Sequence, residues 1–486
     1  MQLTIYRNIR KHVLLYIFIF FVLLYSKQMS QYVINSPLFL NTINSGVVIP
    51  RLTTAQKYAI SSPQAGTLVF DTSLADFQFF NGNGWISSGY GLTGGNYVST
   101  NTDAFGRLRV SNPTTMFESV FRYGDNGKFD TYLTGNATGY VDNASATYLA
   151  TISAANSEIL RQSYNLSPYQ PGKSLLVICS LVCSSTSYGE TGLTQEVGYF
   201  DTNNGIFLRV KDEIVYMCIR NNGVDEAIPQ NAWNVDTLSG TGPSQITLDI
   251  TKAQIFYTDL EWLGVGTVEV GFVINGGFVA VHRFQHANIS NSTYMGTACL
   301  PIRYHIAASG AYTGTSATLK QICSTVISEG GFTPYSTKYY INLGLTTPTV
   351  STTLIPLISI RMQSSQLGKI VIPAQTDLIP LGNATLQYQL IYGGTLTGGS
   401  WVDVGRNSVV QYNTGASAIS GGRVIDFGYV SSSSQSKSVL SNNGPDNFNI
   451  QLGRTITGDS EILSLCAVTF SGSSTVSAAI GWYEIS

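Results

Sequence analysis

The sequence predicts an all-β protein in which a small N-terminal hairpin module precedes two antiparallel β-sandwich modules, of jelly-roll or lectin-like type. Three observations predict this fold class. Only 11% of the 486 residues are Asp, Glu, Lys or Arg, against roughly 25% in ordinary soluble domains. Hydrophobic residues make up 43% and aromatic residues 11%, which is enough to build cores rather than a disordered chain. From Val33 onward, short Val-, Ile-, Tyr-, Phe- and Thr-rich runs alternate with Gly, Asn, Ser and Pro, the pattern of strands and turns.

The composition also excludes several classes of function. The formal net charge is -2 and basic residues are not clustered, so nucleic-acid binding through a basic surface is not expected. The sequence contains no nucleotide-binding glycine motif and no Gly-x-Ser-x-Gly motif of hydrolases. We therefore expect a non-enzymatic protein without a cofactor.

Changes in composition divide the chain into five segments. Gly/Ser-rich stretches interrupt the strand pattern near residues 88–102 and 329–335, as in linkers. The predicted organisation is a hydrophobic N-terminal segment at 1–28, a small β module at 33–87, a linker at 88–102 and β-sandwiches at 103–335 and 336–486.

The N-terminal segment differs from the rest of the chain. Arg7, Arg10 and Lys11 precede an apolar run over residues 13–25. A basic flank before a short apolar run is typical of a signal peptide or short membrane anchor, whereas a full membrane span needs about 20 residues. Alternatively, residues 1–28 are an upstream extension and the protein starts at Met29. Both interpretations remain open.

The small module contains several local signals in a row. Thr53 can cap a helix over residues 53–60, and Trp85 follows a tight turn at residues 81–84. A unit of some 40 residues buries little surface alone, so we expect it to pack on its own copies or on a neighbouring module. The expected strands are Val47–Ile49, ended by Pro50, and a hairpin of Leu68–Asp71 with Phe77–Phe80 around a turn at Ser73–Asp76.

Six cysteines in 486 residues are too sparse to imply a disulfide framework. Cys179 and Cys183 lie an even number of residues apart in an apolar run. On a strand they share one face, where free cysteine behaves as a small core hydrophobe.

Asp259 and Glu261 form the most enzyme-like pair. Residues i and i+2 of a strand point to one face, roughly 6–7 Å apart at Cα, so the separation of about 5–5.5 Å between the carboxyl groups of a retaining glycosidase is possible for these two residues beside Trp262. The third acid that lectin-like polysaccharide-cleaving sandwiches usually carry on the same strand is missing, because Leu263 and Gly264 follow. The alternative is a structural acid pair satisfied by turn amides, by Arg283 or by Lys252. A metal site would combine His282, His286 and His305 with Asp259, and its alternative is hydrogen-bonded turn histidines. We favour the structural alternatives, so no catalytic or metal site is expected.

Aromatic side chains in polar loops are the remaining candidates for a ligand or partner surface. Aromatic rings stack on sugars and anchor protein interfaces, although most aromatics of a β-rich chain lie in its core. The four candidates are Trp233, Tyr188, Tyr294 and Tyr312.

Several segments resemble structural proteins of tailed bacteriophages and large double-stranded DNA viruses. The small module, with Val-Ile-Pro-Arg-Leu-Thr-Thr-Ala-Gln, Gly-Thr-Leu-Val-Phe-Asp-Thr and Phe-Phe-Asn-Gly-x-x-Trp, is similar to a module that recurs in tail fibres. The run from Asp103 to Pro113 is similar to the opening of a virion-protein domain. Further similar segments are 169–173, 256–273, 286–288, 388–394 and 482–485.

The resemblance implies a virion structural protein, a fibre or capsid-surface appendage. Its expected partners are two further copies in a homotrimer, other virion proteins, and a host-surface glycan or protein. One alternative is an appendage that binds or cleaves polysaccharide with Asp259 and Glu261. Another is a surface protein anchored in a membrane by residues 13–25.

Overall fold

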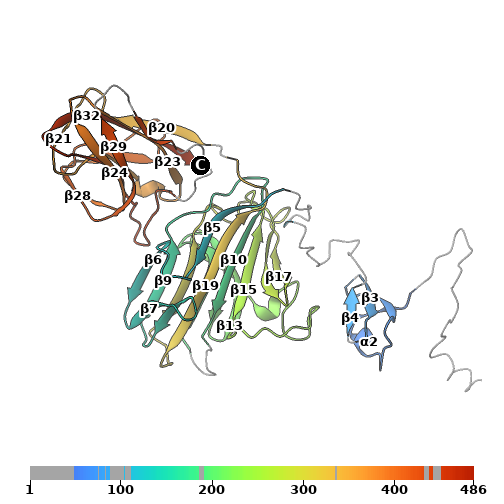
Figure 1. The fold of residues 1–486 in the computed structure, drawn as a ribbon. Helices are drawn as coiled ribbons and strands as arrows, with labels where there is room; N and C mark the ends of the chain where they lie inside the picture. Colours follow the sequence, from blue (N-terminus) through green and yellow to red (C-terminus); the bar gives the residue numbers. More distant parts are fainter. Residues whose placement is uncertain are drawn as a thin grey trace, which may run out of the picture. The chain divides into compact units, whose positions relative to one another are not determined.

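A computed structural model describes residues 49–87 except 75 and 83, residue 103, and residues 111–184, 191–333, 336–431, 437–441 and 450–485. The chain forms two compact units, Met1–Gly95 and Asn96–Ser486. Figure 1 shows strands throughout both units. The all-β prediction is confirmed. The apolar run at 13–25, the linker at 88–102 and Tyr188 lie outside the described residues. No helix within the described residues is long and apolar enough to cross a membrane.

The first unit is a four-stranded sheet with one short helix. The sheet has the order β1-β2-β3-β4, with β1 parallel to β2 and the other pairs antiparallel. The predicted hairpin and helix are confirmed. Of the predicted strand at Val47–Ile49 only Ile49 is described, and it lies outside the strands. The Pro50 carbonyl oxygen accepts from the Phe70 N–H at 2.8 Å, and the register of β1 with β2 begins at Arg51. The elements are β1 Arg51–Leu52, α2 Thr54–Tyr58, β2 Leu68–Asp71, β3 Asp76–Phe80 and β4 Trp85–Ser87.

A buried ion pair joins the helix to the sheet. Thr53 caps α2 in a reciprocal arrangement with Gln56, which fixes the start of the helix. Lys57 then points at the sheet, where its Nζ lies 2.8 Å from Asp71 Oδ2 and 3.0 Å from Gln78 Oε1. Lys57 and Asp71 are 1% and 0% exposed. Burial raises the pKa of Asp71, but bonds from Lys57, Thr54 and the Leu74 N–H outweigh it and leave this pKa below its usual value.

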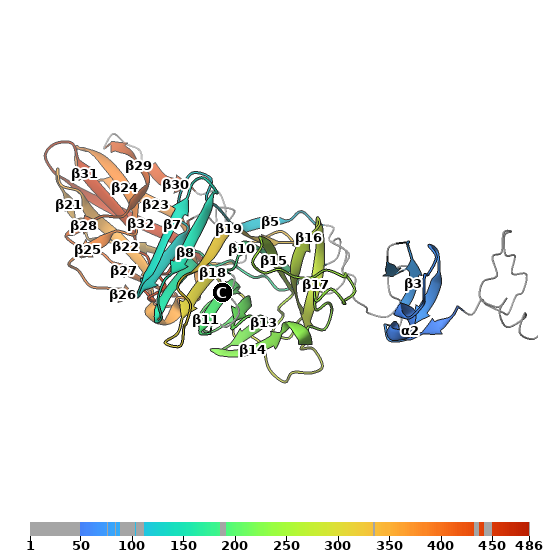
Figure 2. The ribbon, with the colours of Figure 1, turned by 90° about the horizontal axis from the view of Figure 1, so that it is seen from below.

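Two large sheets open the second unit (Figures 1 and 2). The eight-stranded sheet has the order β17-β16-β15-β10-β19-β8-β7, with β5 also paired to β19. Its strands are β5 Thr114–Val120, β7 Ala137–Asp142, β8 Thr147–Ile152, β10 Leu175–Val182, β15 Gln254–Leu260, β16 Val268–Ile274, β17 Gly277–Phe284 and β19 Ala317–Ser328.

The seven-stranded sheet has the order β14-β13-β12-β11-β18-β9-β6, all antiparallel. A single 3-10 turn at Gln230–Ala232 follows β14. The strands are β6 Phe129–Thr134, β9 Ser157–Ser163, β11 Leu193–Phe200, β12 Gly205–Lys211, β13 Ile214–Asn221, β14 Val224–Pro229 and β18 Ile302–Ala308.

One hydrophobic core lies between these two sheets. Cys179 and Cys183 belong to it, as predicted. An arginine lies in it as well: Arg161 is 1% exposed, and its guanidinium lies 3.4 Å from the ring centroid of Tyr148. Its donors reach Gln321 at 3.1 Å and Thr131 at 2.8 Å. A buried cation is tolerated only when it is partnered in this way.

Three smaller sheets complete the second unit, together with a 3-10 turn at Ser364–Gln366. The smaller sheets enclose a core of their own. Three of their isoleucines, Ile370, Ile372 and Ile485, pack instead into the core of the large sheets. The five-stranded sheet holds β20 Thr337–Asn342, β21 Thr349–Val350, β23 Ile370–Pro380, β30 Lys437–Ser441 and β32 Ser474–Ile485; the six-stranded sheet holds β22 Ile355–Met362, β24 Thr385–Tyr392, β26 Val402–Asp403, β27 Val410–Asn413, β29 Arg423–Ser431 and β31 Leu463–Thr469; the two-stranded sheet holds β25 Thr395–Thr397 and β28 Ala418–Ser420.

The buried ion pair of the first unit gives a stability prediction. Replacing Asp71→Asn keeps the shape of the side chain but leaves the Lys57 ammonium buried without its counter-charge. We expect a loss of about 3–5 kcal/mol in the unfolding free energy of the first unit, measured by calorimetry of the full chain. The matched control is Glu118→Gln, whose ion pair with Lys128 is exposed and contributes about 0–1 kcal/mol. Equal effects of the two substitutions would contradict the prediction.

Candidate functional site

The sheet of the first unit has two different faces. One face is buried and includes polar side chains, and the other is apolar and exposed. Val69, Asp71, Gln78 and Trp85 are buried on the face that receives Lys57. Because neighbouring residues of a strand alternate between faces, the strand registers place five apolar side chains together on the other face: Leu68, Phe70, Phe77, Phe79 and Ile86.

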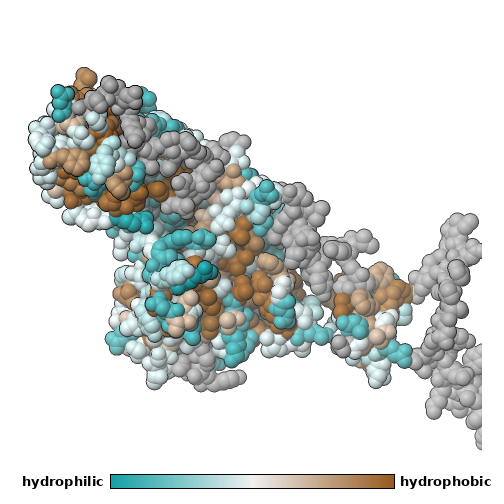
Figure 3. Space-filling model, viewed as in Figure 1, coloured by the Kyte–Doolittle hydropathy of each residue, from teal (hydrophilic) through white to brown (hydrophobic). Residues whose placement is uncertain are grey.

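This apolar face lies open in the single chain. Leu68, Phe77 and Ile86 are 40%, 41% and 41% exposed, and Phe70 meets Phe77 edge to face at 5.1 Å. Figure 3 shows hydrophobic surface on this unit. The guanidinium of Arg51 lies 5.5 Å from the ring centroid of Phe70. Grouped exposed apolar side chains on so small a unit are typical of an association surface.

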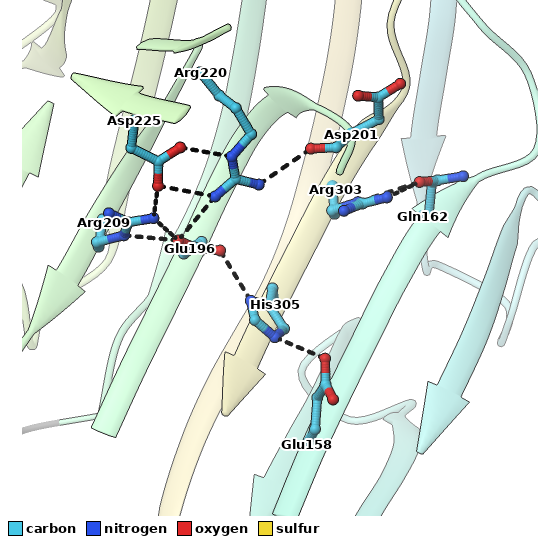
Figure 4. A network of polar contacts seen from close by, with 9 residues as sticks. All are labelled: Glu158, Gln162, Glu196, Asp201, Arg209, Arg220, Asp225, Arg303 and His305. Carbon is cyan, nitrogen blue, oxygen red and sulfur yellow. Dashed lines mark hydrogen bonds and ion pairs between the residues drawn. The ribbon is translucent and has the colours of Figure 1, made fainter. Parts of the chain in front are cut away.

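A second candidate site lies on the outer face of the seven-stranded sheet. Strands β11, β12 and β13 send Val197, Leu208 and Met217 into the core, so alternate residues point outward. Phe200, Phe207 and Cys218 form a small apolar cluster there. Charged residues of the strands around this cluster form a network (Figure 4). Its connected members are Glu158, Glu196, Arg209, Arg220, Asp225 and His305, and Arg220 also donates to the carbonyl oxygen of Asp201, which follows β11. Arg303 of β18 lies beside them and donates instead to Gln162 of β9.

The network is a chain of alternating charges. Arg220 binds Asp225 through two nitrogens, with Nε 2.6 Å from Oδ1 and Nη2 3.1 Å from Oδ2. Arg209 connects Asp225 to Glu196, with Nη2 at 2.5 Å and 2.6 Å from the two carboxylates. His305 then joins Glu196, 2.9 Å from Nδ1, to Glu158, 3.1 Å from Nε2.

Aromatic rings support the arginines of the network. The guanidinium of Arg209 lies 5.2 Å from the ring centroid of Phe207, and that of Arg220 lies 4.9 Å from the same ring. Arg303 lies 5.4 Å from the ring centroid of Phe200. The two rings stack with their centroids 4.4 Å apart. Cation–π contacts of this kind stabilise partly desolvated arginines. The aromatic rings therefore hold the guanidinium groups in place, in addition to the carboxylates that bind them.

The pKa shifts follow from these contacts. Burial raises the pKa of Glu196, but bonds from His305 and the charge of Arg209 outweigh it and hold this pKa at about 2. The bond from His305 lowers the pKa of Glu158. Burial lowers the pKa of His305, yet Glu158 and Glu196 together raise it above its usual value. Burial lowers the pKa of Arg303 to about 10. Ionised carboxylates held by cations are hydrogen-bond acceptors, and poor proton donors for catalysis.

Asp259 and Glu261 are buried, 3% and 0% exposed. Asp259 lies opposite Glu269 in the pairing of β15 with β16. Glu261 follows the end of β15 and accepts a hydrogen bond from the Tyr169 hydroxyl at 3.4 Å. Arg283, offered by the sequence as a partner of this pair, instead binds Glu269 at 2.8 Å. The geometry therefore closes both carboxylates off from solvent.

The three histidines predicted as a metal cluster have different contacts. His282 Nδ1 accepts from the Asn234 N–H at 3.2 Å, and burial lowers its pKa to about 4. His286 Nδ1 lies 2.9 Å from the Gly266 carbonyl oxygen, and its ring stacks on Tyr294. His305 belongs to the network described above. Within the described residues, no group of three or more His, Cys, Asp or Glu side chains is arranged to hold a metal ion.

Three of the four aromatic candidates are not on the surface. Trp233, Tyr294 and Tyr312 are 5–8% exposed and belong to the large core. Predicting them as surface contacts was wrong, because their rings pack into the hydrophobic core of the large sheets. Tyr188 lies outside the described residues.

Apart from His305, the network residues were missed by sequence reasoning. A charged residue at an alternating position of a β-branched or aromatic strand was the available signal, as for Glu196 in Gln-Glu-Val-Gly-Tyr-Phe. Arg209 and Arg220 bind partners on strands close in the sequence, whereas His305 binds Glu158 and Glu196 from more than 100 residues away. Only strand pairing brings His305 to these carboxylates.

Comparison with known proteins identifies part of the chain. Residues 34–103 match a family described as a phage tail like trimerisation region. No curated protein matches the chain. Solved structures similar to it include an endo-1,3-β-glucanase from Streptomyces sioyaensis, at 9% identity and a TM-score of 0.32, covering 45% of this chain and 97% of that one.

Two further structures are similar to the same extent. The carbohydrate recognition domain of Emp47p has 9% identity and a TM-score of 0.30, over 45% of this chain and 98% of that one. A protein of unknown function from Shewanella oneidensis MR-1 has 11% identity and a TM-score of 0.31, over 47% and 92%. These identities and TM-scores are too low to transfer a ligand or an activity to this chain.

The charge network gives a pH-dependent prediction. The pKa of Glu196 is lower in the folded chain than in the unfolded one, so its contribution to stability is present above its unfolded pKa and is lost as the pH falls toward 2. We expect Glu196→Gln to lower the unfolding free energy by about 3 kcal/mol at pH 7, and by progressively less as the pH falls from about 5 to 2. Urea unfolding at several pH values measures this.

In the same experiment, the contribution of His305 to stability depends on pH in the opposite direction to that of Glu196. Its pKa is raised on folding, so its contribution is complete below the unfolded pKa of about 6.5 and is lost as the pH rises through the folded value. We expect the natural chain to lose unfolding free energy as the pH rises through the folded pKa of His305, and His305→Gln to lack this loss. A stability difference between Glu196→Gln and the natural chain that stays constant from pH 7 to 2 would contradict the network interpretation.

Proposed function

We propose that the chain is a homotrimeric, fibre-type structural protein of a virion, assembled through its first unit and displaying its second unit to the host surface. The observation that supports this most directly is the match of residues 34–103 to a phage tail like trimerisation region. That match covers the described strands of the first unit, β1 to β4.

The open apolar face of the first unit supplies the physical reason for association. Burying an apolar surface stabilises a complex in proportion to its area, and the unit is too small to cover this face with its own chain. Leu68, Phe77 and Ile86 project from three successive strands. In a closed three-fold ring the interfaces are heterologous, so each copy contacts its two neighbours with different parts of its surface, and the apolar face can lie at the axis where the three copies meet. Low charge over the whole chain limits the repulsion between identical copies.

We further propose that the protein has no enzymatic activity. The acids of the outer network are ionised and held by Arg209, Arg220 and His305, and Asp259 and Glu261 are buried. These arrangements favour a structural role for each carboxylate. Assay of the purified chain on host-surface polysaccharides tests this, and polysaccharide cleavage that disappears in Glu261→Gln would refute it.

Association with the virion has a direct test. The proposal expects the chain in purified particles by peptide mass spectrometry, and on an external appendage by immunogold electron microscopy. Particles that lack the chain would refute the proposed role, whatever the oligomeric state of the purified protein.

The trimer interface gives a sharper prediction. Phe77→Lys places a charge on the exposed face of the first unit, at little cost to the fold of a single chain, but it would bury three charges in a trimer. We expect the natural chain to sediment as a trimer and Phe77→Lys as a monomer. The control is Leu74→Lys, an equally exposed position in the turn between β2 and β3, which should leave the trimer intact. A trimer of unchanged stability in Phe77→Lys would exclude this face as the interface.

A further inference from the structure

Exposed aromatic rings gather on the outer face of the six-stranded sheet, at its β29 edge. Strands β31, β24 and β29 lie side by side there, and β29 is the last described strand of the sheet (Figure 2). Leu386 of β24 and Val430 of β29 point into the core, so their neighbours along each strand point outward. Phe427 and Tyr429 of β29 and Phe470 after β31 are 59%, 55% and 63% exposed. Three large rings therefore face solvent from one side of this sheet.

Two glutamine amides lie between these rings. Strand β24 runs between β31 and β29, and its Gln387 lies opposite Tyr429. Gln389 lies opposite Phe427 in the same register. The rings of Tyr429 and Phe470 meet at a centroid distance of 5.6 Å. Both glutamines are partly exposed, and neither amide has a hydrogen-bond partner among the residues that the structure describes. Each amide can therefore donate to and accept from a ligand.

The described side chains of this surface carry no charge at neutral pH. We call the surface the aromatic platform; its members face outward from β24, β29 and β31 and are Thr385, Gln387, Gln389, Phe427, Tyr429, Ser431, Val468 and Phe470. A charged ligand would lose hydration on the platform without meeting an opposite charge. Complementarity of charge therefore favours an uncharged ligand.

The platform is too small for a stable protein partner. A whole Phe or Tyr side chain covers about 150–250 Å². Three such rings that are 55–63% exposed therefore present roughly 250–450 Å². A specific protein–protein interface buries about 800 Å² on each partner. A second copy of the chain would need contacts well beyond the platform, whereas a few sugar rings would cover it.

A neutral sugar matches both chemical features of the platform. The C–H groups of a pyranose ring form an apolar face that packs flat on an aromatic ring, and its hydroxyl groups donate and accept hydrogen bonds. Ligand sites commonly combine aromatic surface with a few well-placed polar groups. A purely apolar ligand would instead cover the two amides and leave them unpaired, which is unfavourable.

We infer that the aromatic platform binds a neutral oligosaccharide, whose rings stack on Tyr429 and Phe470 and whose hydroxyl groups pair with the amides of Gln387 and Gln389. The inference rests on the proposed display of the second unit to the host surface and deepens it, because it names the class of surface molecule that this unit contacts. The platform is distinct from the apolar face of the first unit and from the charged network of the seven-stranded sheet.

The decisive variants remove one feature at a time. Tyr429→Ala deletes an exposed ring on an edge strand and should weaken binding about tenfold, with little effect on the melting temperature. Tyr429→Phe keeps the ring and should bind nearly as the natural chain does. Gln387→Leu keeps the volume of the side chain, removes the amide and should also weaken binding about tenfold. The matched control is Tyr140→Ala on β7, where the tyrosine is 57% exposed, and it should leave binding unchanged.

The probes are neutral glucose, mannose and galactose oligosaccharides and an acidic oligogalacturonate, each titrated into the full chain by calorimetry. Binding of a neutral probe that Tyr429→Ala and Gln387→Leu weaken, and that Tyr140→Ala does not, supports the inference. Binding of the oligogalacturonate alone, binding of no probe, or binding that both platform variants leave unchanged overturns it.

Sedimentation of the same samples reports the oligomer independently. A trimer that Tyr429→Ala dissociates, in a chain that binds no probe, would make the platform a contact between copies and overturn the inference, while the proposed trimer stands. A natural chain that sediments as a monomer and binds a neutral probe through the platform would refute the proposed trimer and support the inference. The two failures are therefore distinguishable.

Discussion

Every strand of this chain places alternate side chains on opposite faces of its sheet, and each face must then be covered or made compatible with water. The large sheets meet this constraint by facing each other across one core. In the first unit, the helix covers only one face of the small sheet, through Lys57 and Asp71. On the opposite face, Leu68, Phe77 and Ile86 are 40%, 41% and 41% exposed. The described residues therefore cover the two faces of this sheet unequally.

Several of the few charged residues of the chain are buried as pairs. Burial of a charge is costly unless the charge is paired, and the structure pairs Lys57 with Asp71, and Glu196 with Arg209 and His305. These pairs also cause the shifted pKa values of Asp71, Glu196 and His305. At these positions, pairing of charges fixes one packed arrangement.

The candidate sites differ in how far the sequence predicts them. The hairpin and capped helix of the first unit depend on neighbouring residues, such as Thr53 with Gln56, and they were predicted with their positions. Asp259 and Glu261 are two residues apart in the sequence, but their burial depends on neighbouring strands. Glu158, Glu196 and His305 come from three strands far apart in the sequence. No local pattern distinguishes them from isolated polar residues.

The sequence by itself determined the fold class, the alternation of strands and turns, and the hairpin and capped helix of the small module, because alternation, capping and turn chemistry act between residues close in the chain. Only the tertiary structure decided which carboxylates are ionised, which aromatic rings are buried, and which rings lie beside Gln387 and Gln389 on one outer face. Those properties depend on the register of strands far apart in the sequence. Pairing sets that register, and with it the distances that govern burial and charge.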